Sequence, residues 1–243
     1  DPSVRGRVRK ETSGIGLVIP THNDSGTVIR CLDPVARQTL LPEQVIIADD
    51  ASTDETVEVV ESWHRNDGRL AITIIRRPEN VGLARNVAGA VEQLTTQYFT
   101  KLDADDVYLN EKKLENEKTL IRERGDRVVA YSLTATINSD DEVMSWPRAP
   151  RSSLSSKEIL YRKVEHMPRE FLVSLSALRE VGGYPTRPGL YVDWWLKIAL
   201  ASILPFESTG ELGSGYRKVP RDTSARMSGQ SSHTHAYWIS RGF

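Results

Sequence analysis

The sequence predicts an α/β fold with a largely parallel central sheet flanked by helices. Short apolar runs alternate with stretches of helical periodicity along the first half of the chain, and this alternation is typical of consecutive strand–helix–strand units. Acid-rich segments directly follow three of the runs. With 243 residues, the chain is long enough to bury the core of one such domain.

Four apolar runs are expected to form the strands of this sheet. They lack a regular polar alternation, which indicates that several are covered on both faces. Their connections should be right-handed crossovers, because parallel strands of one sheet are almost always joined in that way. The expected strands are residues 15–19, 44–48, 70–75 and 97–102.

Three helices are expected between the strands, over residues 25–38, 52–66 and 81–94. Pro34 lies inside the first, and a break or kink is expected there because proline removes a backbone hydrogen bond. Ser52 and Glu55 open the second at the spacing of a capping box. The third places small and aliphatic side chains on one stripe, which is typical of a helix that packs on a sheet.

The second half of the chain is expected to add a helix, a hairpin, a loop and a last helix, over residues 110–125, 127–143, 149–157 and 193–202. Asn110 suits the N-cap of the first of these helices, and Gly125 suits its C-terminal end. An Asn-Ser-Asp-Asp sequence suits the turn of the hairpin. The polar residues near the C-terminus predict no regular element.

The composition limits the classes of partner. Lys and Arg number 32 against 33 Asp and Glu, so no overall positive field would attract nucleic acid. The apolar runs are a handful of residues long, and we expect no transmembrane segment. The single cysteine, Cys31, excludes an internal disulfide and is typical of a reducing compartment. We therefore expect a cytoplasmic protein in which Cys31 is a buried, inert thiol.

The acid-rich segments are expected to meet at one edge of the sheet. They are residues 20–24, 49–55 and 103–106, after the first, second and fourth expected strands. Ligands of open parallel sheets bind beyond the carboxyl ends of the strands. Clustered carboxylates repel an anion unless a cation joins them, and Mg²⁺ or Mn²⁺ on one or two Asp is usually completed by phosphate oxygens. A metal-bound diphosphate is therefore the expected ligand.

Simpler explanations of these acids stay open. Asp103, Asp105 and Asp106 could form a solvated turn, since Asp favours turns for local reasons. A structural calcium site is another possibility, although the spaced oxygen ligands of a calcium loop are missing. Asp49 and Asp50 could be acids favoured by the dipole at a helix N-terminus.

Five segments resemble, in the same order, the motifs of the inverting glycosyltransferase family 2, whose members have the GT-A fold. They are "VIPTHN" (18–23), "ADDASTDET" (48–56), "NVGLARN" (80–86), "LDADD" (102–106) and "VGGYPTRPGLYVDWWLKIAL" (181–200). The resemblance implies a Rossmann-like, mostly parallel sheet with a smaller acceptor-side subregion. It divides the chain into an N-terminal extension (1–13), a nucleotide-sugar-binding half (14–110), an acceptor-binding half of the same domain (111–220) and a tail (221–243).

The resemblance implies a site for a nucleotide-sugar donor, most often a UDP-sugar in this family, with Mn²⁺ or Mg²⁺ as cofactor. Asp105 matches the metal-binding acid, and Asp103 would lie at the donor sugar or its metal. Asp50 would accept a hydrogen bond from the base, and Arg85 would lie near the phosphates or the sugar. The residues expected to contact the nucleotide are Pro20, Thr21, Asn23, Asp50 and Arg85.

The resemblance also implies an acceptor side, with Asp193 as the general base and with Gly182, Gly183, Tyr184 and Trp194 around it. Trp194 and Trp195 would form an apolar wall that raises the pKa of Asp193, or a platform for a sugar ring. A simpler role for Asp193 is that of helix N-cap. Val192 departs from the Glu that often precedes this base in the family.

A second departure concerns the metal. Val219 stands where the family often has a metal-binding His. His233 or His235 could replace it, but surface histidines of a polar tail are the simpler explanation of these two residues.

The expected function is metal-dependent, inverting transfer of a single sugar to an acceptor hydroxyl. The Gln-x-x-Arg-Trp motif of the processive polysaccharide synthases is missing from the sequence, which favours single sugars. A sugar-phosphate nucleotidyltransferase is a weaker alternative, because its first loop would be Gly-rich and basic. Residues 20–26 instead hold one Gly and no Lys or Arg. A non-catalytic nucleotide-sugar-binding domain also stays open, because Val192 alters the neighbour of the base.

Overall fold

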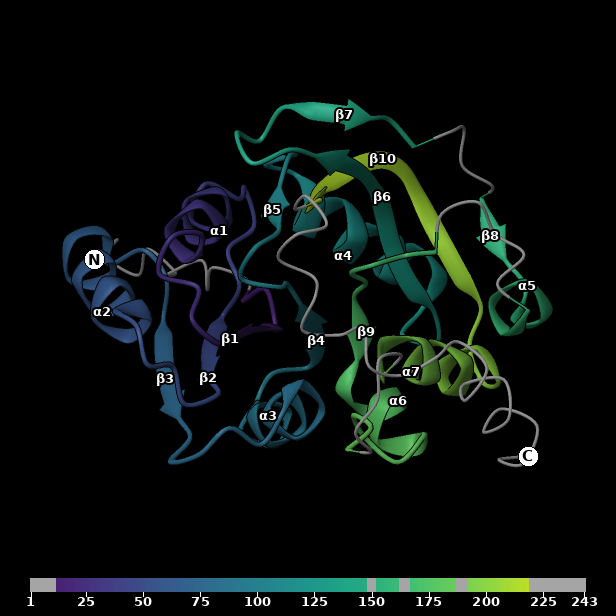
Figure 1. Ribbon diagram of the computed structural model, residues 1–243. Coiled ribbons are helices and arrows are strands. Elements are labelled where there is room, and N and C mark those ends of the chain that lie inside the picture. Colours follow the sequence, from purple (N-terminus) through teal and green to yellow (C-terminus); the bar gives the residue numbers. More distant parts are fainter. Residues whose placement is uncertain (1–11, 148–151, 162–166, 187–191, 219–243) are drawn as a thin grey trace, which may run out of the picture.

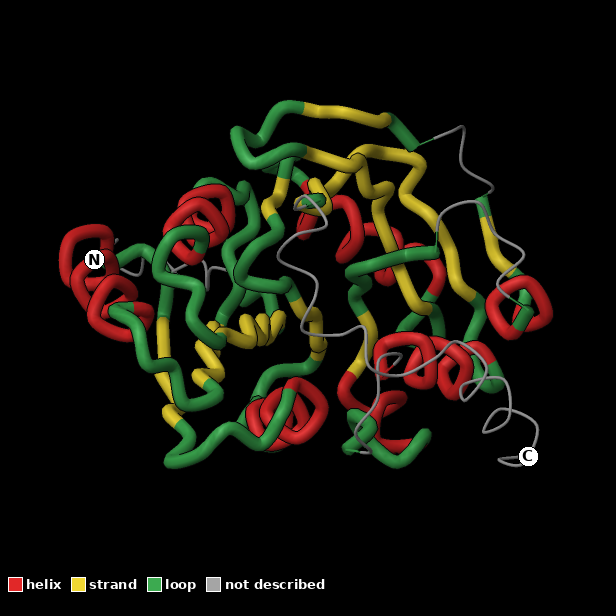
Figure 2. Tube along the Cα trace, in the orientation of Figure 1, coloured by secondary structure: helices red, strands yellow, loops and turns green. Residues whose placement is uncertain are grey.

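The computed structural model describes residues 12–147, 152–161, 167–186 and 192–218. Its strands form two sheets, ordered β3-β2-β1-β4-β9 and β5-β10-β6-β7, with β8 paired to β10. Figure 1 and Figure 2 show the first sheet with α1, α2 and α3 on one side of the molecule, and the second sheet with α4, β7 and β8 on the other. The expected α/β architecture with a mostly parallel central sheet is confirmed.

The first sheet consists of four parallel strands and one short antiparallel strand. They are β1 Ile15–Thr21, β2 Gln44–Asp49, β3 Ile72–Arg76 and β4 Tyr98–Lys101, with β9 Val173–Ser174 beside β4. The four expected strands are all present, with ends shifted by at most two residues. β1 and β4 are buried along their whole length, as expected for strands covered on both faces.

The first three helices cover both faces of this sheet. They are α1 Val28–Ala36, α2 Thr56–Asp67 and α3 Leu83–Val91. Ile15 and Leu17 of β1 share a buried cluster with α1 and α2, whereas Val18 shares one with α3. Cys31 is fully buried in α1 and forms no disulfide, as expected.

The second sheet is mixed, with β6 and β10 parallel and β5 and β7 antiparallel to their neighbours. The expected hairpin is confirmed as β6 and β7. The elements of this half are β5 Val107–Tyr108, α4 Lys113–Arg124, β6 Val129–Ile137, β7 Val143–Ser145, β8 Ser153–Leu154, α5 Ser156–Leu160, α6 Leu175–Glu180, α7 Val192–Ala201 and β10 Phe206–Arg217. In the part of the chain that the structure describes, no helix has the length and apolar character needed to cross a membrane.

The expected break at Pro34 and the expected start of the second helix are both wrong. α1 runs through Pro34 without a break and ends two residues later. α2 begins at Thr56 without a side-chain cap, because the Ser52 hydroxyl instead accepts a hydrogen bond from the backbone amide of Asn23. The expected capping box of Ser52 and Glu55 is therefore replaced by a bond between two loops at the sheet edge.

The ends of α4 and α5 also differ in part from expectation. Asn110 is not the N-cap of α4, since its side chain accepts from the amide of Lys112 in the turn before the helix (2.8 Å). Gly125 follows the helix with φ 82°, as expected. The segment 149–157 is not entirely a loop, because Ser155 forms a capping box that starts α5.

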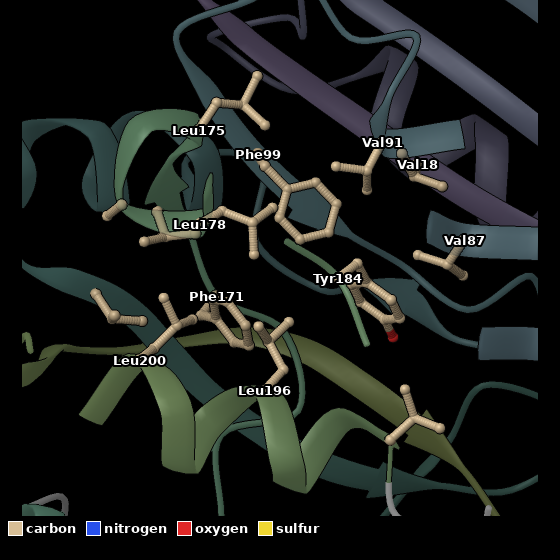
Figure 3. Close-up of a cluster of buried hydrophobic side chains, with 14 of the residues drawn as sticks. Val18, Val87, Val91, Phe99, Phe171, Leu175, Leu178, Tyr184, Leu196 and Leu200 are labelled. Carbon is tan, nitrogen blue, oxygen red and sulfur yellow. The ribbon is translucent and has the colours of Figure 1, made fainter. Parts of the chain in front are cut away.

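A buried cluster joins the first sheet to α6 and α7. Figure 3 shows Phe99 of β4 beside Tyr184, with Leu196 of α7 next to Phe171. The rings of Phe99 and Tyr184 meet edge to face with their centroids 6.2 Å apart. Because Tyr184 and Leu196 are both fixed in this core, the N-terminal turn of α7 is held beside the carboxyl end of β4.

Candidate active site

The acid-rich segments meet at the carboxyl edge of the first sheet, as expected. Thr21 at the end of β1 donates a hydrogen bond to Asp49 at the end of β2 (3.3 Å). The His22 ring lies 2.9 Å from the Asp50 backbone carbonyl. Burial raises the pKa of Asp24 to about 6, and the charge of Asp105 in the loop after β4 contributes to this rise. Pro20 is buried inside β1.

Asn23 fixes the loop after β1 to the loop after β2. Its backbone has φ 60°, a conformation that Asn tolerates better than most residues. Its side-chain oxygen accepts hydrogen bonds from the amides of Thr53 (2.8 Å) and Asp54 (3.3 Å). Asn23 therefore shapes this edge of the sheet through the loop backbone.

Asp50 is already bound by backbone amides. It is 5% exposed, and its two oxygens accept from the amides of Val81 (2.8 Å) and Gly82 (2.9 Å), directly before α3. Each carboxylate oxygen has a second lone pair, so Asp50 can still accept a hydrogen bond from the N–H of a nucleotide base. Arg85 lies exposed in the first turn of α3 and forms no ion pair with the described residues.

A hollow of about 450 Å³ opens beyond the ends of β2 and β3. Residues 51–53 and 76–78 line it. Arg76 lies 3.8 Å from Asp49 and donates to the backbone carbonyl of Ser52 (3.3 Å), while Arg77 donates to the side chain of Asn86 (3.3 Å). This hollow is larger than the hollow along β6 (about 210 Å³) and the small one at Asp193 (about 10 Å³).

The acidic loop (residues 103–106) is partly neutralised by cations of the chain itself. Asp103 pairs with Lys101 (2.5 Å) and lies 3.6 Å from Arg169. Arg169 also lies 3.4 Å from Asp106.

Asp105 is the acid of this loop that forms no ion pair with any described residue. Burial followed by the charge of Asp103 raises its pKa, and the more distant charges of Arg169 and Lys101 oppose this rise only in part. One oxygen of Asp106 is buried without a hydrogen-bond partner, and burial followed by Glu170 raises its pKa to about 8. A bound cation would relieve both effects, so the residues present fit one.

Such a cation would need ligands from a substrate. No three His, Cys, Asp or Glu side chains among the described residues converge around one point. Asp105 would hold the ion, with the remaining ligands from phosphate and water, as Mg²⁺ usually requires. Val219, His233 and His235 lie outside the described residues.

Arg217 anchors the acidic loop from the second sheet. Its guanidinium donates to the backbone carbonyl of Asp105 (2.7 Å) and its amide to the Asp106 carboxylate (2.9 Å). Arg217 also pairs with Asp141 in the β6–β7 turn, and Asp141 pairs with Arg30 of α1 (2.5 Å). The hairpin turn therefore fixes the loop position, a role that the sequence did not indicate.

Asp193 lies in the first turn of α7, beside the acidic loop. The Tyr184 hydroxyl donates to its Oδ1 (2.6 Å), and the Lys101 ammonium lies 3.5 Å from its Oδ2. Its side chain keeps 35% of its surface exposed. Since α7 includes Val192, Asp193 is inside the helix and not its N-cap.

The electrostatics of Asp193 differ from expectation. Burial alone would raise its pKa, but Lys101, Lys197 and the Tyr184 hydroxyl lower it to about 2. The expected rise through an apolar wall is therefore wrong. Trp194 instead donates its indole N–H to the backbone carbonyl of Ile159 (3.0 Å) and ties α7 to α5.

Gly182, Gly183 and Tyr184 of the expected acceptor side have defined contacts within the chain. Gly182 and Gly183 have φ 91° and 83° and follow α6, with their amides bonded to the carbonyls of Arg179 and Leu178. A Cβ on either glycine would contact no described atom within 4 Å, so the positive φ angles are the reason within the protein for glycine at these positions. Tyr184 is only 5% exposed and lies beneath Asp193.

Val192 is 6% exposed and belongs to the apolar core. The position that precedes Asp193 thus faces away from the acidic loop.

The sequence reasoning missed four cations of this site. Lys101, Lys197 and Arg217 are each at most 7% exposed, and Arg169 stacks on the Tyr216 ring (3.6 Å). The sequence contains one signal for Lys101 and Lys197, because each of these lysines interrupts an otherwise apolar run. A lysine buried in that setting requires carboxylate partners.

Known proteins resemble this chain over most of its length. Chondroitin synthase of Escherichia coli is 26% identical over 202 residues, which are 82% of this chain and 28% of that protein. Chondroitin synthase of Pasteurella multocida is 29% identical over 157 residues, which are 60% of this chain and 15% of that protein. The chain therefore spans less than a third of the length of these relatives.

Solved structures share its fold at lower identity. Staphylococcus aureus TarS in complex with UDP-GlcNAc gives a TM-score of 0.71 at 18% identity, covering 93% of this chain and 64% of that one. Mannosyltransferase PcManGT from Pyrobaculum calidifontis, in complex with GDP-Man and Mn²⁺, gives 0.63 at 16% identity, covering 93% and 68%. These likenesses confirm the GT-A fold.

The family model of glycosyl transferase family 2 matches residues 17–179, which is more than half of the chain. The chain belongs to glycosyl transferase family 2.

Proposed function

We propose that the protein is a metal-dependent, inverting glycosyltransferase that moves one sugar from a nucleoside-diphosphate sugar to an acceptor hydroxyl. The observation that carries this proposal is the position of Asp193 beside the acidic loop. Asp193 projects an ionised, partly exposed carboxylate from α7, and Asp105, in the loop after β4, forms no ion pair with a described residue. Asp193 is ionised and placed to take a proton, although its lowered pKa makes it a weak base in the resting protein, and Asp105 can hold a cation at a diphosphate.

The donor side consists of residues 14–110 in this proposal. The nucleotide occupies the hollow beyond β2 and β3, which residues 51–53 and 76–78 line. Asn23 holds Thr53 of this lining (2.8 Å), and Pro20 and Thr21 lie in the neighbouring strand β1. Asp50 reads the base, and Arg85 approaches the phosphates or the sugar. Uridine is supported by the UDP-GlcNAc that TarS binds, although PcManGT binds GDP-Man.

The chemistry follows from the position of Asp193. It removes the proton of the acceptor hydroxyl, whose oxygen attacks the anomeric carbon opposite the leaving nucleoside diphosphate. A bound Mn²⁺ or Mg²⁺ would stabilise the negative charge that develops on the leaving group. Asp103 lies near the donor sugar. A single displacement with the base opposite the leaving group inverts the anomeric centre.

The acceptor side consists of residues 111–220 in this proposal. A second hollow of about 210 Å³ lies along β6, lined by residues 131–136, 167–169 and Tyr216. Arg169 lines both this hollow and the small one at Asp193, so the two are neighbours. Hydroxyl side chains such as Ser132 and Thr134 would suit a sugar or polyol acceptor.

The alternatives have less support. A nucleotidyltransferase would need cations around a triphosphate in the loop after β1, whereas that loop is held by Asn23, Asp24 and Asp54. A non-catalytic binding domain was suggested by Val192, but this residue faces the core and not the site. The expected cytoplasmic location stays a prediction.

The first prediction is that a nucleoside diphosphate binds through the metal. We expect the affinity for UDP to fall at least about tenfold when EDTA replaces Mn²⁺, because the carboxylates of the loop then repel the phosphates. Asp105→Asn should reproduce this loss in the presence of Mn²⁺. Isothermal titration calorimetry measures both affinities.

Asp67→Asn is the matched control, because Asp67 lies at the far end of α2 with Arg69 as its partner. Equal UDP affinity with Mn²⁺ and with EDTA would contradict the metal-bridged donor site.

A further inference from the structure

Lys101 occupies an unusual position for a lysine. It is the last residue of β4, only 7% exposed, and its strand neighbour in β1 is Val18. Burial alone would lower the pKa of Lys101, but Asp103 and Asp193 raise it well above its ordinary value. A charge is buried at this depth only where carboxylates compensate it.

The ammonium of Lys101 joins the two sides of the site. It lies 2.5 Å from Oδ1 of Asp103 in the acidic loop and 3.5 Å from Oδ2 of Asp193 in α7. The other oxygen of Asp193 is held by the Tyr184 hydroxyl at 2.6 Å. Two separate groups therefore fix the two oxygens of Asp193, which limits rotation of this carboxylate.

The Lys101 ammonium also affects which acids of the acidic loop can bind a cation. Asp103 is occupied by Lys101 and Arg169, and Asp106 by Arg169 and the Arg217 amide. Asp105 is left without an ionic partner among the described residues.

We propose that Lys101 is a positioning residue: it orients Asp193 toward the acceptor and occupies Asp103, so that Asp105 is left to bind the divalent cation. The first part rests on the proposed transfer reaction. The second part concerns the charges of the acidic loop and can be measured without turnover.

Lys101→Met keeps much of the side-chain volume and removes the charge. We expect kcat for transfer to fall at least about tenfold while the KM for the donor stays within about threefold, because the base is misoriented and donor contacts remain. Lys101→Arg should restore part of kcat. Lys118→Met is the matched control with unchanged kcat, since Lys118 contacts Tyr98 at the other end of β4.

The second readout is Mn²⁺ affinity in the absence of donor, measured by the electron paramagnetic resonance of free Mn²⁺. We expect Lys101→Met to bind Mn²⁺ at least about fivefold more tightly, because a nearby positive charge is lost and the Asp103 oxygen that Lys101 held becomes available as a ligand, while Arg169 stays near the other oxygen. Lys101→Met/Asp103→Asn removes both charges together and should return the affinity to within about threefold of the wild type. If Lys101→Met alone fails to fold, this double variant, which also lacks the ammonium beside Asp193, is used in its place to measure kcat.

Wild-type kcat in Lys101→Met would overturn the positioning role, and unchanged or weaker Mn²⁺ binding in that variant would overturn the assignment of the acids. An Mn²⁺ affinity of the double variant equal to that of the single variant would also overturn the assignment of the acids. If the wild-type protein turned over no donor, the proposed function would fail, but the Mn²⁺ titration would still decide the charge assignment.

Discussion

Replacing Asp193 with asparagine is expected to lower the rate of sugar transfer by about 10²-fold or more, with donor and Mn²⁺ affinity nearly unchanged. Asparagine keeps the size of the side chain and can still accept from the Tyr184 hydroxyl, which lies 2.6 Å from Oδ1 in the wild type. It cannot take a proton. Steady-state kinetics for transfer and calorimetry for donor binding measure the two effects separately.

Asp33→Asn is the matched control for this variant. Asp33 in α1 also accepts a hydrogen bond from an aromatic side chain, the Trp63 indole (2.8 Å), but it lies away from the acidic loop. We expect its transfer rate to equal that of the wild type. A full transfer rate in Asp193→Asn would place the base elsewhere, with Glu170 as the next acid to test.

Glu170 is a poorer candidate on the structure. It is 4% exposed, and its carboxylate accepts a hydrogen bond from the Ser214 hydroxyl. Asp222, another acid that could replace Asp193, lies outside the described residues.

Replacing Lys113 with methionine is expected to lower the free energy of unfolding by about 3–5 kcal/mol, because it leaves a buried carboxylate without its partner. Lys113 and Glu117 in α4 are 1% and 0% exposed, and the ammonium lies 2.8 and 2.9 Å from the two carboxylate oxygens. The ammonium also lies 4.7 Å from the centre of the Tyr108 ring. Urea unfolding curves measure the change.

The pH dependence and a double variant test the cause of this loss. Burial raises the pKa of Glu117 even beside Lys113, and without the lysine it should rise further. A carboxyl whose folded pKa exceeds its unfolded pKa stabilises the folded state when protonated, so the deficit should shrink as the pH falls. Lys113→Met/Glu117→Leu should recover most of the stability, since apolar pairs often replace buried ion pairs without loss. A double variant as unstable as the single one would contradict this cause.

The fold was predictable from the sequence because its signals are periodic and local. The four strands of the first sheet begin within two residues of their expected starts, since each is an apolar run bounded by polar residues. The convergence of residues 20–24, 49–55 and 103–106 followed from strand direction alone. Helix starts failed where side chains bond across loops, as Ser52 does with Asn23.

The sequence predicted the acids of the site but not the cations that pair with them. Acids after strands are visible in a sequence, and Asp105 and Asp193 are found on the same side of the molecule as expected. The partners of Asp103 and Asp106 come from distant positions such as Arg169 and Arg217, which no spacing rule connects to the acidic loop. The lowered pKa of Asp193 depends on Lys101 and Lys197, whose approach is fixed by packing of α7 on the first sheet.

The stereochemistry of sugar release tests the central claim most directly. An α-linked nucleotide-sugar, chosen as the one that most raises Tm with Mn²⁺, is incubated with the protein, and the first sugar product is followed by proton NMR of its anomeric signal. The account predicts that the product appears first as the β anomer, whether the acceptor is a hydroxyl compound or water, and that Asp193→Asn suppresses it. Initial release of the α anomer would contradict a single displacement assisted by Asp193.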